Sequence, residues 1–115
     1  MYFKKKLYSA IFVLGILLLF GCGEKENKSL IDIEIIGLEY STIKKGETYK
    51  LVAQKYYANG VIRYDNATWG SSNSKIVRVN DDGLIKALEV TGDTPIIITA
   101  KEDRLIGTKE IYVIE

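Results

Sequence analysis

The chain has 115 residues, of which 16 are basic and 15 acidic, with one cysteine and no histidine. This length fits one small domain, and the two signs of charge alternate along it, whereas nucleic-acid binding needs a clustered basic excess. Without histidine and with a single cysteine, the chain lacks the usual proton shuttle of neutral pH, a Cys-His or Ser-His nucleophilic site and a zinc site. We therefore expect no cofactor and no nucleic-acid partner.

Residues 1–21 have the pattern of a lipoprotein signal peptide. Three lysines at 4–6 precede an apolar stretch from Leu7 to Phe20, which at 14 residues is shorter than the roughly 20 that a transmembrane helix needs. The stretch ends in Leu19-Phe20-Gly21-Cys22, which resembles the bacterial lipobox. This resemblance implies cleavage before Cys22, transfer of a diacylglycerol to its thiol and acylation of the new amino group, for example with palmitate. An ordinary secretory signal followed by an incidental cysteine is the alternative.

Residues 22–29 are predicted to be a lipidated flexible tether, because Gly23–Ser29 contains no apolar residue and cannot pack into a core. Residues 30–115 then form one domain. Gly23 is not the aspartate that retains some lipoproteins in the inner membrane. We therefore expect a membrane-anchored lipoprotein of the cell envelope, at the outer membrane or the cell surface, and the side on which it lies is left open.

From residue 30 onward the pattern is that of β-strands. Isoleucine alternates with acidic residues over 31–35, which predicts a strand with Ile31, Ile33 and Ile35 on its buried face. After a turn at 44–46, residues 48–54 predict one second strand. Its inward row consists of Tyr49, Leu51 and Ala53.

Turn signals separate the remaining predicted strands. Asn59-Gly60 favours a type I′ hairpin turn, and Asn80–Gly83 favours a second hairpin between residues 76–79 and 84–88. The last two strands are predicted at 96–100, directly after Pro95, and at 110–114, with Gly107 relaxing the turn between them. About seven short strands without a helical period predict an all-β fold, an antiparallel β-sandwich. A small barrel is the alternative.

Four motifs occur in the order found in bacterial immunoglobulin-like domains of group 2. They are Gly46-Glu47-Thr48, Trp69-Gly70-Ser71-Ser72-Asn73, the turn from Val79 to Gly83, and Ile98-Thr99-Ala100. From about Ile31 to Val113 the chain resembles this family, a module of invasin- and intimin-like adhesins and other surface proteins. The resemblance implies an immunoglobulin-like sandwich for binding or adhesion at the cell surface. Its partner is expected to be a host protein, an envelope protein or a surface polysaccharide.

Four aromatic residues are candidates for a core or a binding role. Trp69 is predicted to pack in the core, as a central tryptophan does in immunoglobulin-like sandwiches, and an exposed ligand anchor is the alternative. Tyr56, Tyr57 and Tyr64 are predicted ligand-binding residues, because a hairpin can carry tyrosines outward and tyrosine is enriched at binding surfaces. Packing inward or across strands is their alternative role.

The chain is predicted not to be an enzyme, with no catalytic residue. Its adjacent carboxylate pairs, Asp81-Asp82 and Glu102-Asp103, fall in predicted turns, where solvated loop charge explains them. Residues 80–82 offer oxygen ligands for Ca²⁺ but lack the spacing of a calcium loop, so no metal site is predicted. Two rival functions remain: a structural subunit of a periplasmic envelope complex, and a carboxylate-dependent glycan hydrolase.

Overall fold

The computed structural model describes residues 29–115. The predicted signal peptide, Cys22 and most of the predicted tether lie outside these residues. Residues 29–115 form ten strands and no helix, which confirms the predicted all-β fold. The strands are β2 (Leu30–Ile36), β3 (Thr42–Lys44), β4 (Thr48–Lys50), β5 (Val52–Tyr57), β6 (Ile62–Arg63), β7 (Thr68–Ser71), β8 (Val77–Val79), β9 (Leu84–Ala87), β10 (Ile96–Glu102) and β11 (Leu105–Ile114).

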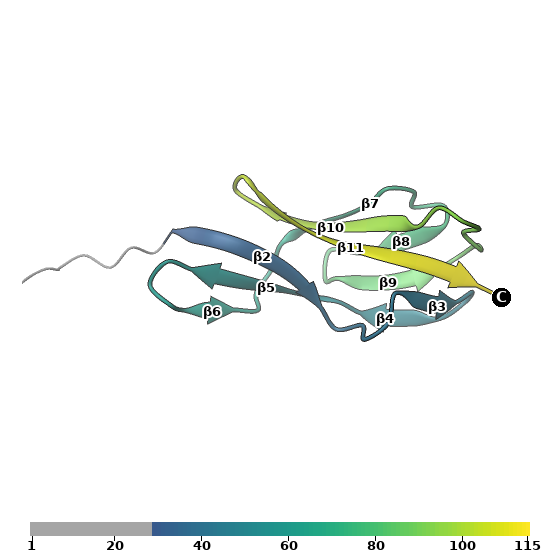
Figure 1. Ribbon diagram of the computed structural model, residues 1–115, viewed down its shortest axis with the longest axis horizontal. Helices are drawn as coiled ribbons and strands as arrows, with labels where there is room; N and C mark the ends of the chain where they lie inside the picture. The colour runs from purple at the N-terminus through teal and green to yellow at the C-terminus, as the bar shows by residue number, and fades with distance from the viewer. Residues whose placement is uncertain (1–28) are drawn as a thin grey trace, which may run out of the picture.

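The strands form a sandwich of one large and two small sheets (Figure 1). The large sheet has the order β3-β11-β10-β7, and the small sheets have the orders β2-β5-β6 and β4-β9-β8. All pairs are antiparallel except β3 with β11, which run parallel, an exception that the sequence did not predict. Each sheet ends in two edge strands, so the described chain is a sandwich and not a closed barrel.

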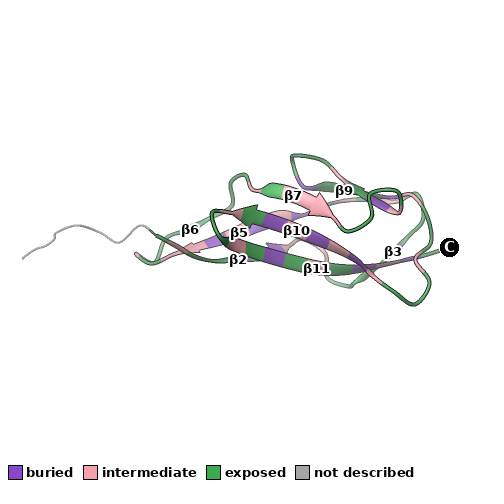
Figure 2. Ribbon diagram, turned by 90° about the horizontal axis from the view of Figure 1, so that it is seen from above, coloured by how far each residue is buried: buried purple, intermediate pink, exposed green. Residues whose placement is uncertain are grey.

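Side chains from all three sheets meet in one hydrophobic core. Buried residues alternate with partly buried or exposed ones along β10 and β11, as the colours of Figure 2 show, because successive side chains of a strand point to opposite faces. The core is almost entirely aliphatic. Its buried members are Ile33, Ile35, Ile43, Leu51, Ala53, Val77, Ile85, Ala87, Ile96, Ile98, Ala100, Ile111 and Val113.

The first strand buries two of its three predicted isoleucines. Ile33 and Ile35 are buried, but Ile31 is 58% exposed, so the prediction for Ile31 was wrong. The pairing of β2 with β5 shifts register between Leu30 and Asp32. Such a bulge adds one residue to a strand and breaks the alternation of its side chains. Ile31 is that residue, and it points away from the core.

The predicted second strand is in fact two strands that belong to different sheets. β4 pairs with β9 and β5 pairs with β2, and the chain passes from one to the other at Leu51. The Leu51 N–H donates to the Gly83 carbonyl oxygen at 2.8 Å. The predicted inward row nevertheless continues through the change of sheet: Leu51 and Ala53 are buried and Tyr49 is partly buried.

Both predicted central hairpins are present, but the turn at Asn59-Gly60 is not type I′. That type needs positive φ at both central residues, and only Gly60, at +87°, has it. The Gly60 N–H donates to the Tyr57 carbonyl and the Tyr57 N–H donates to the Val61 carbonyl, both at 2.9 Å. These bonds define a three-residue loop, a type I turn followed by a left-handed glycine.

The hairpin of β8 and β9 repeats this geometry, with Gly83 at φ +85°. The Gly83 N–H donates to the Asn80 carbonyl at 3.1 Å, and the Asn80 N–H donates to the Leu84 carbonyl at 3.0 Å. Glycine is needed here for a second reason. A Cβ at residue 83 would lie 2.8 Å from the indole ring of Trp69.

The final hairpin is longer and its turn tighter than predicted. β10 begins directly after Pro95, as expected, but β10 and β11 stay paired out to Glu102 and Leu105, so only two residues form the turn. Asp103, with φ 56°, takes the left-handed conformation there. Gly107 does not relax the turn, because it lies inside β11. A Cβ at Gly107 would lie 2.8 Å from the Ile33 carbonyl oxygen, so glycine lets β11 approach β2.

Candidate ligand-binding site

The structure separates the three tyrosines that the sequence proposed as one binding group. Tyr56 and Tyr57 are neighbours on β5, so their side chains point to opposite faces of the sheet. On the outer face, the Tyr56 hydroxyl donates to Glu34 Oε1 at 3.0 Å, and the Tyr64 hydroxyl accepts from Gln54 Nε2 at 3.2 Å. Tyr57 lies on the inner face, where its hydroxyl donates to Glu102 Oε2 at 3.5 Å.

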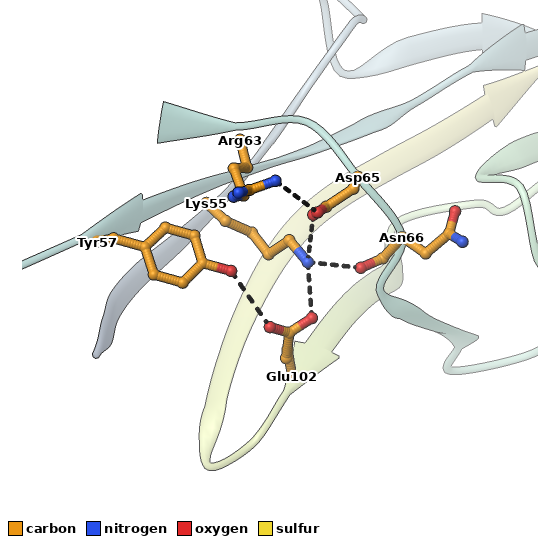
Figure 3. A network of polar contacts seen from close by, with 6 residues as sticks. All are labelled: Lys55, Tyr57, Arg63, Asp65, Asn66 and Glu102. Atoms are coloured by element: carbon orange, nitrogen blue, oxygen red, sulfur yellow. Dashed lines mark hydrogen bonds and ion pairs between the residues drawn. The ribbon is translucent and has the colours of Figure 1, made fainter. Parts of the chain in front are cut away.

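Lys55, which the sequence analysis did not single out, is the centre of the polar contacts on the inner face (Figure 3). Its Nζ atom donates to Asp65 Oδ1 at 2.6 Å, to Glu102 Oε1 at 2.6 Å and to the Asn66 carbonyl oxygen at 2.7 Å. A lysine ammonium has three donors, so all of them are used. The residue is only 2% exposed, and these bonds compensate its buried charge.

The position of Lys55 follows from the strand pattern. It continues the inward row of Leu51 and Ala53 at a spacing of two residues. A strand of this alternation therefore predicts an inward side chain at residue 55. The sequence does not reveal the two acidic partners, because Asp65 lies 10 residues and Glu102 lies 47 residues further along the chain.

Lys55 and Asp65 hold each other in the ionised state. Burial alone lowers the pKa of Lys55, but hydrogen bonds to Asp65 and Glu102 outweigh burial and raise that pKa. The hydrogen bond from Lys55 in turn lowers the pKa of Asp65. A lysine that stays protonated and uses all its donors is neither a nucleophile nor a base. The role of the cluster is therefore structural: it joins β5, the segment after β6 and the end of β10.

Beside this cluster lies an open hollow of about 380 Å³. We call it the tip hollow, because the β5–β6 hairpin forms it at one end of the sandwich (Figure 1). Its Arg63 is opposite Lys55 in the strand pairing and contacts Asp65 Oδ2 only at 3.8 Å. The Arg63 side chain is 61% exposed. The tip hollow is lined by Tyr57, Asn59, Val61, Arg63 and Asp65.

Trp69 is neither fully buried in the core nor fully exposed as a ligand anchor. It is partly buried on β7 and packs against the core and against Gly83. It also lines a small pocket of about 80 Å³ between the two small sheets, together with Tyr64, Lys50 and Asp82. The core prediction is therefore confirmed in part, because Trp69 packs against the core without being fully buried.

The two carboxylate pairs do not form a common site. Asp81 and Asp82 lie in the turn between β8 and β9, where Asn80 Oδ1 accepts from the Asp82 and Leu84 N–H groups. Glu102 is bonded to Lys55 and Asp103 forms the last hairpin turn. Within residues 29–115, no group of three or more His, Cys, Asp or Glu side chains is arranged to hold a metal ion.

The model of the bacterial Ig-like domain (group 2) family matches residues 38–108. The chain belongs to this family. The match extends from just before β3 into β11, so β2 precedes it, and the sequence resemblance from Ile31 to Val113 identified the family correctly. A search of curated proteins finds no match to the chain. Bacterial Ig-like domains of this group are generally non-catalytic modules of surface proteins.

Cys22 lies outside the described residues, so its predicted lipidation stays a prediction. Residues 29–115 contain no helix that is long and apolar enough to span a membrane.

Proposed function

We propose that this protein is a lipid-anchored module of the bacterial cell envelope that binds a partner through the tip hollow. Cys22 carries the lipid, residues 22–29 join it to the domain, and residues 30–115 form the binding module. The Leu19-Phe20-Gly21-Cys22 sequence supports the anchor. Family membership supports a non-catalytic surface module. Two lipid chains suffice for stable anchoring, since one alone gives only marginal binding.

Arg63 carries the argument for ligand binding. Its guanidinium is largely exposed, and its one ion pair, to Asp65, is long at 3.8 Å. Arginine has five N–H donors, so several remain for a ligand. Tyr57 and Asp65 add a hydroxyl and a carboxylate to the same hollow. Its volume lies at the lower end of the roughly 300 to 1,000 Å³ typical of ligand sites.

These groups suit the hydroxyl and carboxylate groups of a sugar. We therefore propose a surface polysaccharide as the ligand, which makes the protein an adhesion module. A glycan array probed with the mature chain tests this. Loss of a charged hydrogen bond costs about 1.5–3 kcal/mol, so Arg63→Ala should weaken binding by roughly tenfold to a hundredfold.

Two variants control this experiment. Arg78→Ala removes an exposed arginine from β8, away from the tip hollow, and should bind as the wild type does. Tyr64→Ala changes the outer face of the same small sheet and should also bind normally. Loss of binding in Tyr64→Ala with none in Arg63→Ala would refute the tip hollow and move the ligand to the outer face.

Protease treatment of intact and lysed cells tests the location. Digestion on intact cells, with a periplasmic marker protected, is expected of a surface adhesion module. Protection until lysis would reject that role. Together with a stoichiometric envelope partner in pull-downs, protection would favour the alternative of a periplasmic structural subunit.

A further inference from the structure

Two exposed isoleucines lie at the end of the domain where the tether enters. Ser29 lies at this end, because its carbonyl accepts from the Ala58 N–H, in the loop of the β5–β6 hairpin, at 2.8 Å. Ile31 is 58% exposed and Ile62 46%. We call these two residues the tether-end patch.

The arrangement of strands explains why these side chains are exposed. The bulge in β2 turns Ile31 away from the core. Ile62 pairs opposite Tyr56, and Asp32 pairs with Tyr56 from the other side. Directly paired residues share a face, so Ile62 lies on the outer face. No strand of the described chain pairs with β6 on its free side.

The tether limits what can cover this patch. Ser29 is seven residues after Cys22, so the chain between them spans at most about 25 Å even when fully extended. A short link of this kind gives an effective concentration in the millimolar range between the two sites it joins. A weak apolar surface is then sufficient for contact with the bilayer that holds the lipid.

We propose that the tether-end patch rests on the surface of the membrane in which Cys22 is anchored, an inference that depends on the lipid anchor of the proposed function. The charges nearby are mixed, with Asp32 beside Ile31 and Arg63 beside Ile62. Contact is therefore apolar rather than electrostatic, and anionic lipid is not required. Tyr56, on the same face, suits the membrane interface, where tyrosine is enriched.

Site-specific fluorescence quenching tests this inference. The chain has one cysteine, and acylation blocks it, so Ile62→Cys supplies a unique thiol for a fluorophore. The matched control is Ile114→Cys, the same residue type at the same exposure of 46%, near the C-terminus at the opposite end of the sandwich (Figure 1). The acylated mature variants are reconstituted in phosphatidylethanolamine vesicles with nitroxide-labelled lipid, with and without phosphatidylglycerol.

We expect several-fold stronger quenching at residue 62 than at residue 114, with and without phosphatidylglycerol. Adding Ile31→Ser to the Ile62→Cys variant should abolish the difference, with Trp69 fluorescence showing that the domain is folded. Equal quenching at both positions would refute the inference. So would quenching at residue 62 that rises when the protein is diluted in the membrane, because a second copy would then cover the patch at the higher density. Failure of the acylated wild type to float with vesicles would instead refute the lipid anchor.

Discussion

Replacement of Lys55 by alanine should destabilise the domain more than any other single change to a charged residue. The substitution removes three hydrogen bonds of the Nζ atom, two of them to carboxylates. Asp65 and Glu102 then lose the cation between them, so that only the long 3.8 Å pair of Arg63 with Asp65 is left, and the Asn66 carbonyl loses its donor. The aliphatic stem of Lys55 also leaves an otherwise filled position on β5.

The magnitude follows from burial. Breaking a buried ion pair by removing one partner costs about 3–5 kcal/mol. Here the Lys55 side chain is 3% exposed, but those of Asp65 and Glu102 are 53% and 33% exposed, so water screens the carboxylates that remain. We therefore expect a loss of about 2–3 kcal/mol, a large fraction of the 5–15 kcal/mol of a typical domain.

Urea unfolding followed by tryptophan fluorescence measures this loss. Trp69 is the sole tryptophan, and its partly buried ring makes it a probe of the folded state. Lys55→Met separates charge from packing, since it keeps an aliphatic stem, and should lose about half as much stability. Glu102→Gln leaves two of the three bonds in place and should cost about 1 kcal/mol. A change below about 0.5 kcal/mol in Lys55→Ala, the range of ordinary surface substitutions, would refute the argument.

Three further predictions concern pH, the tryptophan and a glycine. The hydrogen bond from Lys55 lowers the pKa of Asp65 from 3.8. The contribution of Asp65 to stability is therefore complete above pH 3.8 and is lost as the pH falls through the lowered pKa. Acid unfolding monitored by circular dichroism should be less steep in Asp65→Asn, and an unchanged profile would contradict this. Trp69→Ala should cost about 2–4 kcal/mol, at or below the range for a fully buried ring, and thermal unfolding by circular dichroism measures it; a loss below about 1 kcal/mol would mean that the ring does not support the core. Gly107→Ala should cost about 1–3 kcal/mol by overpacking against Ile33, and an unchanged urea midpoint would contradict the close approach of β11 to β2.

Local sequence patterns predicted most of the fold because each depends on near neighbours. Glycine and asparagine marked both central hairpins correctly, since positive φ at Gly60 and Gly83 is a local requirement. The predictions failed where pairing with strands distant in the sequence determines the local structure. The sheet change at Leu51 depends on pairing with β9, and the exposure of Ile31 depends on a bulge opposite β5.

The candidate site was predicted only in part for the same reason. The sequence selected Tyr57 with Tyr56 and Tyr64, but strand alternation places Tyr57 on the opposite face from Tyr56. Residue composition also gave no sign of the Lys55 cluster, because its partners come from the segment after β6 and from the end of β10. The inward row from Leu51 was the one usable signal, since it predicts an inward lysine that needs acidic partners.

Mass spectrometry of the N-terminal peptide from the membrane fraction tests the lipid anchor most directly. We expect a peptide that begins at Cys22, ends at Lys25 after trypsin digestion and carries a diacylglycerol. Cys22→Ser should abolish both cleavage and lipid. A chain that still begins at Met1, or one cleaved elsewhere with an unmodified Cys22, would rule out the lipid anchor.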